Sequence, residues 1–338
     1  MRQALHEIQR HEGGNSTCCT RDESAYLAAY GPAALGHRRQ LIADLVTVWF
    51  FAHGHADLLD RVDIHVVEYD GTYSHNLMRN VAMENAGTDF LLHIDVDFFV
   101  PPHTFETLVH TYTSLLCGEP KVIVLPHFDV YKIDMSTGQK LKQPKAGTET
   151  ISHQVIPLEE LSKACRNKPS IVERFFNGTA TEFHAWTYHH EPNNGTAGID
   201  YWRWTRANRT WSIPHDTMAQ KSEPLFAFQR TSVFPRFDVG FSGRGWNRIS
   251  HTHELRLMDF EFLVAPDLFL CHPSEAYQHT RLDWADFKRN ARFFKEWYVA
   301  KQHHWEDAGR RDIAYQTMKT EGGAACGHVP TERIRTSY

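Results

Sequence analysis

The 338-residue sequence lacks the features by which several classes of protein are recognised at once. It has no apolar stretch of about 18 residues, the length that a membrane-spanning helix needs, so we expect no span in it. Its first residues, MRQALHEIQRHEGG, contain no apolar signal-peptide segment and, taken alone, indicate a cytoplasmic protein. The net charge of −5 provides no basic surface, so neither nucleic acid nor an anionic membrane is an expected partner.

The six cysteines form no CxxC pair and show no spacing typical of a zinc site. They are compatible with disulfides and equally with reduced thiols, and the sequence leaves both open. Four Asn-x-Ser/Thr triplets, which are acceptor sites for N-glycosylation, argue against the cytoplasm and favour the lumen of the secretory pathway. The triplets begin at Asn15, Asn177, Asn194 and Asn208.

A regular alternation of strands and helices occupies the first half of the chain. The residue patterns predict strands at 62–70, 89–100 and 121–128, and helices at 74–87 and 104–117. Strands that alternate with helices at this spacing are typical of an α/β fold with a mainly parallel sheet. We expect residues 89–100 to form a central strand, because they are apolar on both faces. The first helix is expected to bury one apolar face, formed by Leu77, Val81 and Ala82.

The remaining segments predict one domain with irregular ends. Residues 1–36 are expected to be poorly ordered, residues 37–318 to form a single domain, and residues 319–338 to form a flexible tail. Residues 140–222 lose all periodicity and predict a loop-rich insertion. Residues 283–305 predict a helix with one apolar stripe, which consists of Trp284, Phe287, Ala291, Phe294 and Tyr298.

Two carboxylates, Asp95 and Asp97, interrupt the apolar segment LLHIDVDFFVPP at residues 91–102. They lie towards the carboxyl end of the strand predicted at 89–100, at the edge of the sheet where ligands bind in open α/β folds. A bend at the strand end lets both side chains approach one ligand, and hard oxygen ligands suit Mg²⁺ or Mn²⁺. Such an ion holds a diphosphate and neutralises it as it leaves. The alternative is that one Asp caps the next helix and the other is solvated.

Three collinear segments resemble glycosyltransferase family 49, which includes the LARGE-type glucuronyltransferases and the β-1,4-glucuronyltransferase of dystroglycan glycan synthesis. In residues 73–102, a helix containing Asn-Leu-Met-Arg-Asn-Val-Ala precedes a strand that ends in Asp-x-Asp. Residues 237–255 contain the Gly-x-Gly-Trp-Asn block of the family, followed by His and Glu-Leu. Residues 260–274 resemble the family's strand that ends in a histidine. The matches extend over roughly residues 70–300.

The resemblance implies a glycosyltransferase-A fold, an α/β Rossmann-like nucleotide-sugar domain with a mostly parallel central sheet. Its usual first strand is not evident in the first 40 residues of this chain. The family implies a Mn²⁺-dependent enzyme, with Mg²⁺ as an alternative ion, that inverts the anomeric centre. It moves a sugar, with glucuronic acid a candidate, from a UDP-sugar to a glycan or glycoprotein acceptor. It also implies the Golgi lumen and a membrane anchor that this chain does not show. The alternative is an inactive family member that binds glycans or acts as a scaffold.

The resemblance further implies which residues hold the metal. Asp97 would ligate it directly, Asp95 would reach it through water or bind the donor's ribose or sugar, and His272 would be the third ligand. An imidazole with two carboxylates is acceptable to Mn²⁺ and leaves positions for diphosphate oxygens. Family members often carry another histidine two residues later, where this chain has Ser274.

The donor would be held by two further groups of residues. Arg79 and Asn80 lie on the helix before the Asp-x-Asp strand, and a guanidinium suits either a diphosphate or a sugar carboxylate. The alternative for Arg79 is an exposed helix arginine. The glycine-rich loop contributes Gly245, Trp246 and Asn247, with Trp246 either a stacking platform for a sugar or the core of a packed turn.

An inverting transferase needs a general base beside the acceptor hydroxyl. Glu254 and Asp238 are the candidates in the matching block, and an ordinary structural role is the alternative for each. The aromatic part of the insertion is the expected acceptor surface, or else a satellite core beneath a long loop. It contains His184, Trp186, His189, Trp202 and Trp204.

Overall fold

The computed structural model describes residues 65, 73–131, 156–183, 198–216, 221–273 and 281–326. The chain divides into two compact units, residues 1–74 and 75–338, and nearly all described residues belong to the second. The segment expected to be poorly ordered lies outside the described residues, and so does the predicted strand at 62–70 except for residue 65. Among the residues that the structure describes, no helix combines the length and the apolar character needed to cross a membrane.

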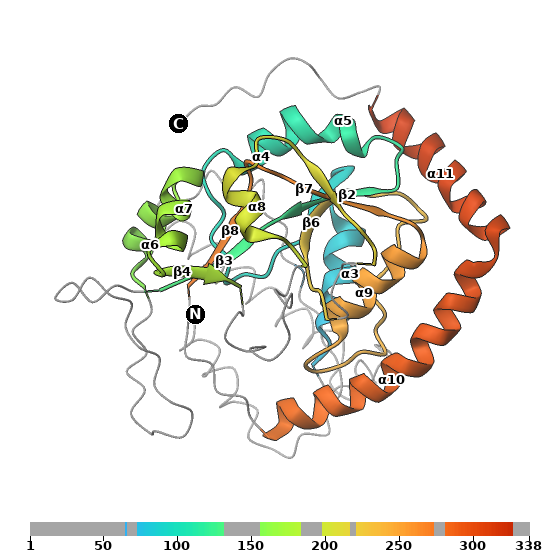
Figure 1. The fold of residues 1–338 in the computed structure, drawn as a ribbon. Helices are drawn as coiled ribbons and strands as arrows, with labels where there is room; N and C mark the ends of the chain where they lie inside the picture. The colour runs from blue at the N-terminus through green and yellow to red at the C-terminus, as the bar shows by residue number, and fades with distance from the viewer. Residues whose placement is uncertain are drawn as a thin grey trace, which may run out of the picture. The chain divides into compact units, whose positions relative to one another are not determined.

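A five-stranded sheet forms the centre of the second unit (Figure 1). Its strand order is β1 (Phe90–Leu92), β6 (Leu225–Gln229), β2 (Lys121–Leu125), β7 (Glu261–Val264) and β5 (Trp211–Ile213).

The predicted α/β class is confirmed. The prediction of a mainly parallel central sheet is wrong for the described strands. Within this five-stranded sheet only β2 and β7 pair in parallel, whereas β1 with β6, β2 with β6, and β5 with β7 are antiparallel. The reason is that β6 runs in the reverse direction between β1 and β2. As a result β1, which was expected to be central, lies at the edge of the described part of the sheet.

A second, three-stranded sheet carries residues of the candidate site. Its order is β4 (Ala180–Glu182), β3 (His127–Val130) and β8 (Leu270–Pro273), with β3 and β8 parallel. The strand predicted at 121–128 is therefore two strands in two sheets. They are separated by Pro126, which has no N–H to donate to a ladder.

Both faces of the central sheet are buried. Val122 and Val124 of β2 lie in one hydrophobic cluster, and Ile123 and Leu125 lie in another, as alternation along a strand requires. The first cluster includes residues of α3 (His75–Asn85), α9 (Asn247–Leu257) and α11 (Ala308–Cys326). The second includes residues of the continuous helical run that consists of α4 (Thr104–Thr107), η2 (Leu108–Tyr112) and α5 (Thr113–Leu116).

The helix predicted at 283–305 is confirmed as α10 (Arg281–Glu306). Phe294 and Trp297 are buried in a third cluster with Phe241, Trp246 and Ile249, and Phe287, Ala291 and Tyr298 pack against it. The apolar stripe of α10 thus packs against the loop that precedes α9 and against the first turn of α9.

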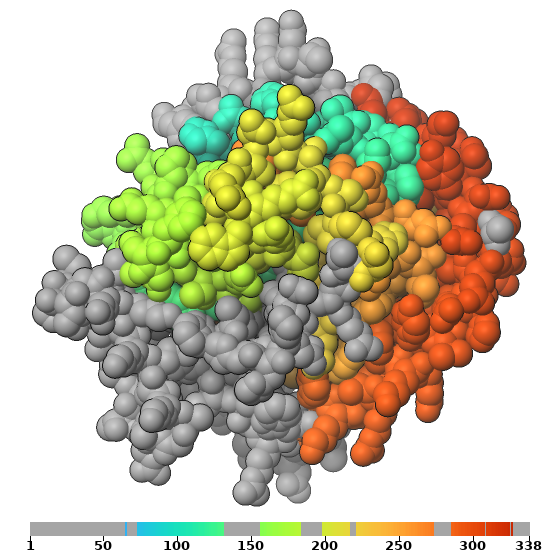
Figure 2. Space-filling view, viewed as in Figure 1, coloured from blue at the N-terminus to red at the C-terminus, as the bar shows by residue number. Residues whose placement is uncertain are grey.

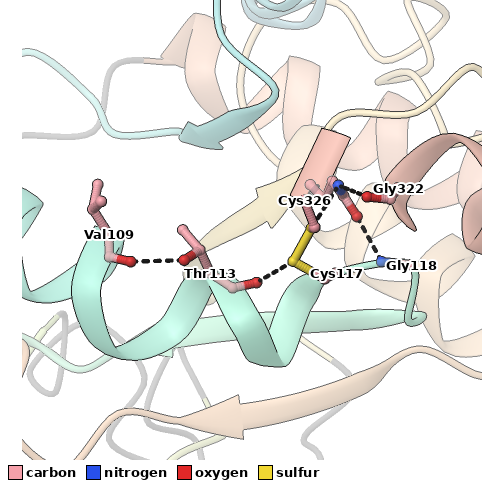
Figure 3. The surroundings of a disulfide bond; sticks show 7 residues. Val109, Thr113, Cys117, Gly118, Gly322 and Cys326 are labelled. Carbon is pink, nitrogen blue, oxygen red and sulfur yellow. Dashed lines mark hydrogen bonds between the residues drawn. A yellow bond between two sulfur atoms is a disulfide. The ribbon is translucent and has the colours of Figure 1, made fainter. Parts of the chain in front are cut away.

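The prediction of a flexible tail from residue 319 does not hold for residues 319–326, because α11 continues to Cys326. A disulfide joins Cys326 to Cys117 at the end of α5, with a Cα–Cα distance of 5.9 Å (Figure 3). Beside it, Gln229 of β6 donates to the Gly322 carbonyl at 3.0 Å and accepts from the Gly118 N–H at 2.8 Å. These contacts fasten α11 to the central sheet.

The insertion at 140–222 contains regular elements where it is described. They are α6 (Leu158–Ala164), α7 (Lys168–Phe176), β4, α8 (Tyr201–Arg206) and β5. A second disulfide joins Cys165, which follows α6, to Cys271 of β8. Of the two alternatives that the sequence left open, disulfides are therefore confirmed for these four cysteines.

Candidate active site

The segment with the two acids is a turn rather than the end of a long strand. Strand β1 ends at Leu92, and the Phe98 N–H donates to the Asp95 carbonyl at 3.2 Å. Val96 between the acids is fully exposed. This turn directs Asp95 and Asp97 to different partners.

Asp95 is held by two buried arginines from two helices. Arg79 of α3 donates to one carboxylate oxygen at 3.4 Å, and Arg248 of α9 donates to the other. The Arg79 and Arg248 side chains are only 9% and 5% exposed. Burial raises the pKa of Asp95, but the charges of Arg248 and Arg79 outweigh it and hold that pKa below its usual value. Asp95 therefore remains ionised and joins α3, α9 and the turn.

Asp97 faces His272, as the resemblance implied. The two side chains approach to 3.5 Å between Nε2 of His272 and Oδ2 of Asp97. The other ring nitrogen, Nδ1, contacts Asp129 of β3 at 2.9 Å, and Asp129 is the direct partner of His272 in the β3–β8 pairing. Burial lowers the pKa of His272, but the hydrogen bonds with Asp129 and Asp97 prevail and raise it to about 9.

This arrangement fits a divalent ion held partly by substrate, and it does not fit an ion enclosed by protein. No group of three or more His, Cys, Asp or Glu side chains in the described ranges is arranged to hold a metal. Asp97 is 59% exposed and His272 presents Nε2 beside it, whereas Asp95 is engaged by arginines. Mg²⁺-type ions commonly use one or two protein ligands and complete their shell with phosphate oxygens and water. A carboxylate such as Asp129 on the second ring nitrogen is the usual support for a ligating histidine.

The face that helix α3 buries is mainly polar. The prediction that this helix buries an apolar face is therefore wrong. Its buried residues are Asn76, Arg79, Asn80 and Met83, whereas Leu77 and Val81 are half-buried and Ala82 is exposed.

Asn80 lies beside the glycine-rich loop and pairs with the backbone. Its amide donates to the Phe237 carbonyl at 2.8 Å and accepts from the Phe237 N–H at 2.9 Å. Asn76 donates to the carbonyls of Asp238 and Asn247. The helix before the Asp-x-Asp turn therefore fixes the position of the loop at 237–247.

Helix α10 holds the same loop from the other side. The Asn290 amide donates to the carbonyls of Ser242, Arg244 and Gly245 at 2.9–3.1 Å. Gly245 has φ 81°, and a Cβ there would overlap the Phe287 ring, so the close approach of α10 requires glycine.

Trp246 and Asn247 form the start of α9. Trp246 has φ 65°, is 7% exposed, and packs on Phe294 with a ring-centroid distance of 4.5 Å. This is the geometry of a packed turn, and it leaves no open ring face for a sugar. Asn247 donates to the Gly243 carbonyl at 3.3 Å and accepts from the Arg248 N–H at 2.7 Å, which places Arg248 at the first turn of α9.

The two candidate bases both contact α10. Glu254 lies on α9 and accepts from Lys301 and, at 3.5 Å, from Trp305. Asp238 accepts from Trp297 at 2.8 Å and from the Gly240 N–H at 2.8 Å. Both carboxylates therefore already accept hydrogen bonds from side chains of α10.

The expected acceptor surface is only partly described. Trp202 of α8 is 54% exposed, whereas Trp204 is fully buried and donates to the Ala265 carbonyl at 3.0 Å. The other members of this set, His184, Trp186 and His189, lie outside the described residues.

Sequence reasoning missed Arg248 and Asp129. Arg248 directly follows the Gly-x-Gly-Trp-Asn block, within the segment 237–255 that resembles the family, so its position carried a signal. Asp129 lies in the buried strand β3, 143 residues from His272, and no local pattern indicates that the two side chains are in contact.

Comparison with known proteins identifies the family. A family model described as glycosyl-transferase for dystroglycan matches residues 61–304. Because this match covers more than half of the sequence, the chain belongs to glycosyltransferase family 49.

Among its relatives are LARGE-type proteins of animals. Human xylosyl- and glucuronyltransferase LARGE1 is 25% identical over 77% of this chain. The Caenorhabditis elegans glycosyltransferase-like protein LARGE is 26% identical over 64%, and chicken LARGE2s is 25% identical over 81%. The matches cover 30%, 29% and 31% of these relatives, so the chain spans less than a third of their length.

Proposed function

We propose that this chain is a metal-dependent, inverting glycosyltransferase domain that moves a sugar from a UDP-sugar to a glycan or glycoprotein acceptor. The proposal rests on the contact between the side chains of Asp97 and His272. Next to it, Arg79 and Arg248 both form ion pairs with Asp95. Because relatives are named xylosyl- and glucuronyltransferases, UDP-glucuronic acid and UDP-xylose are the first donors to test. The two disulfides and the Asn-x-Ser/Thr triplets support the Golgi lumen as its location.

In this function Asp97 and His272 are the residues that hold Mn²⁺ or Mg²⁺. The bound ion would neutralise the charge that develops on the departing diphosphate. Asp129 holds the His272 ring in one orientation through Nδ1, so that Nε2 faces Asp97.

Arg79 and Arg248 supply fixed positive charge next to this pair. Both side chains are buried, and Nε of Arg248 has no hydrogen-bond partner among the described residues. A preorganised guanidinium pair stabilises a diphosphate without reorganising during the reaction. Asp95 keeps the two arginines in place, and in the proposal this role replaces its expected contact with the metal through water, or with the ribose or sugar of the donor.

Glu254 and Asp238 remain the candidates for the base that takes the acceptor proton. Glu254 is 3% exposed, so acceptor binding would have to open its contact with α10. Asp238 lies in the loop itself and is the more accessible of the two, being half-buried.

The test is a direct assay of UDP release. The purified chain is incubated with a panel of UDP-sugars, with Mn²⁺ and with chelator, and with a set of glycan acceptors. We expect Mn²⁺-dependent release with at least one donor, and loss of it in Asp97→Asn. The absence of any release, together with the absence of Mn²⁺-dependent nucleotide binding, would falsify the proposal. Lys295→Ala, an exposed change on α10, is the matched control and is expected to retain activity.

A further inference from the structure

Two large aromatic side chains lie side by side on the surface of the second unit. Phe176, at the end of α7, is 58% exposed, and Trp202 of α8 is 54% exposed. Their ring centroids are 5.4 Å apart, and Trp202 also packs against Phe175 at 5.1 Å. Figure 2 shows the residues of α7 in green and of α8 in yellow on the near face of the molecule. Contiguous exposed apolar surface, unlike scattered single side chains, often marks a site where another group binds.

The residue that follows Phe176 is Asn177, which is exposed and begins the triplet Asn177-Gly178-Thr179. Its side-chain oxygen accepts from the Thr179 N–H at 3.0 Å and from the Thr179 hydroxyl at 2.6 Å. Gly178 has φ 75°, a conformation that glycine adopts without strain and that brings Thr179 back to Asn177.

This turn uses the oxygen of the Asn177 carboxamide. No hydrogen bond from its nitrogen, Nδ2, is found within the described part of the chain. Nδ2 is the atom to which an N-linked sugar is attached. The exposed turn next to the aromatic pair therefore leaves the linkage atom available.

The disulfides supply an independent observation about compartment. Cys117 pairs with Cys326, and Cys165 pairs with Cys271, although the partners are 209 and 106 residues apart. Such bonds form and persist in oxidising compartments, among them the lumen of the endoplasmic reticulum, where N-glycans are added.

We propose that Asn177 carries an N-linked glycan whose first N-acetylglucosamine covers the rings of Phe176 and Trp202. The co-reactant is an oligosaccharide linked to a lipid diphosphate. The bond between its C1 and the diphosphate oxygen breaks as C1 bonds to Nδ2, and Nδ2 loses one proton. The apolar face of the sugar, made of C–H groups, packs on aromatic faces, while its hydroxyls stay in water. This inference is independent of the proposed transferase activity.

The first experiment measures occupancy. The full chain is directed to the secretory pathway of a eukaryotic cell line that makes high-mannose glycans. Peptide N-glycosidase F in H₂¹⁸O then marks each glycosylated Asn by its conversion to Asp. We expect the peptide containing Asn177 to carry the label. A peptide that is recovered without it, from protein that has formed both disulfides, overturns the proposal.

The second experiment tests the contact with the rings. Asn15, Asn194 and Asn208 are changed to Gln, so that of the four Asn-x-Ser/Thr triplets only the one at Asn177 remains. Endoglycosidase H leaves one N-acetylglucosamine on Asn177, whereas peptide N-glycosidase F leaves none. We expect the melting temperature to be about 2 °C higher with the single sugar, which corresponds to roughly a 1 kcal/mol contact.

Trp202→Ala is the matched variant for this comparison. Trp202 is more than half exposed, so its removal leaves the fold intact. We expect the difference between the two enzyme treatments to disappear in this variant, because the platform has been removed. If the difference is absent in the unchanged protein, or persists undiminished in Trp202→Ala, the proposed packing on the aromatic pair is overturned.

Discussion

The two carboxylates of the turn at residues 95–97 face different partners, and single substitutions separate their roles. Asp95 accepts from two buried arginines, so Asp95→Asn weakens two charged contacts. We expect the free energy of unfolding to fall by about 2 kcal/mol, as for lost hydrogen bonds to charged groups. Asp97→Asn is the matched control, since Asp97 is 59% exposed. We expect it to change stability by less than about 0.5 kcal/mol in chemical denaturation.

The same pair of variants also distinguishes structure from function. Asp97→Asn is expected to lose Mn²⁺-dependent UDP release while it remains stable. If instead Asp97→Asn is as destabilised as Asp95→Asn, the division of roles within the turn is wrong.

His251 of α9 makes stability depend on pH. Its ring stacks on Phe237 with centroids 3.9 Å apart, Nε2 contacts the Pro235 carbonyl at 2.9 Å, and Nδ1 has no partner among the described residues. Burial, chiefly, lowers the pKa of His251 from 6.5 to about 3. Between these values the unfolded chain binds a proton that the folded chain does not.

The free energy of unfolding therefore falls as the pH drops from 6.5 towards 3, by at most about 1.4 kcal/mol per pH unit from this group. Above pH 6.5 the group contributes no pH dependence. His251→Gln cannot take up this proton, so we expect a shallower slope in urea denaturation across the window. Equal slopes for the variant and the unchanged protein would contradict the assignment.

At the scale of elements, α10 acts as the support of the glycine-rich loop. Asn290 is 1% exposed and its amide contacts three loop carbonyls. Asn290→Ala leaves these carbonyls without that donor, and we expect a loss of about 2 kcal/mol in the free energy of unfolding. Lys295→Ala on the exposed face of the same helix is the control, with an expected change within about 0.5 kcal/mol. Similar effects of the two changes would show that α10 does not hold the loop through Asn290.

The sequence predicted elements well where their pattern was local. Helix α10 was expected because apolar residues recur at helical spacing, and it covers the predicted residues 283–305. The strand at 121–128 was predicted too long, because Pro126 ends β2 and the chain enters a second sheet. The buried face of α3 was wrong, because its buried polar residues are satisfied by the loop at 237–247, which sequence spacing cannot reveal.

At the scale of the whole molecule, the side-chain contacts that form the candidate site join residues far apart in the sequence. Asp97 and His272 were predicted to share a metal because the family's motifs imply it, and their side chains lie 3.5 Å apart. Asp129 and Arg248 were missed, since their partners lie 143 and 153 residues away and only the fold brings them together. The direction of β6 was missed for the same reason, because strand pairing is a long-range property.

The disulfide between Cys117 and Cys326 joins two residues 209 positions apart and so closes a covalent loop through most of the second unit. It tethers α11, whose Gly322 approaches Gln229 so closely that a Cβ would overlap that side chain. The double variant Cys117→Ser/Cys326→Ser removes this tether. We expect the free energy of unfolding to fall by about 3 kcal/mol, chiefly because the unfolded chain becomes less constrained.

Amide hydrogen exchange is the decisive measurement for this variant. If α11 depends on the tether, its amides exchange much faster in the variant, whereas those of β2 and β7 accelerate only as much as the loss of global stability dictates. The matched control is Cys18→Ser/Cys19→Ser, which also removes two cysteines and is expected to leave α11 protected. Unchanged exchange in α11 after loss of Cys117 and Cys326 would mean that Gln229 and the buried Ala314 and Met318 hold the helix without the disulfide.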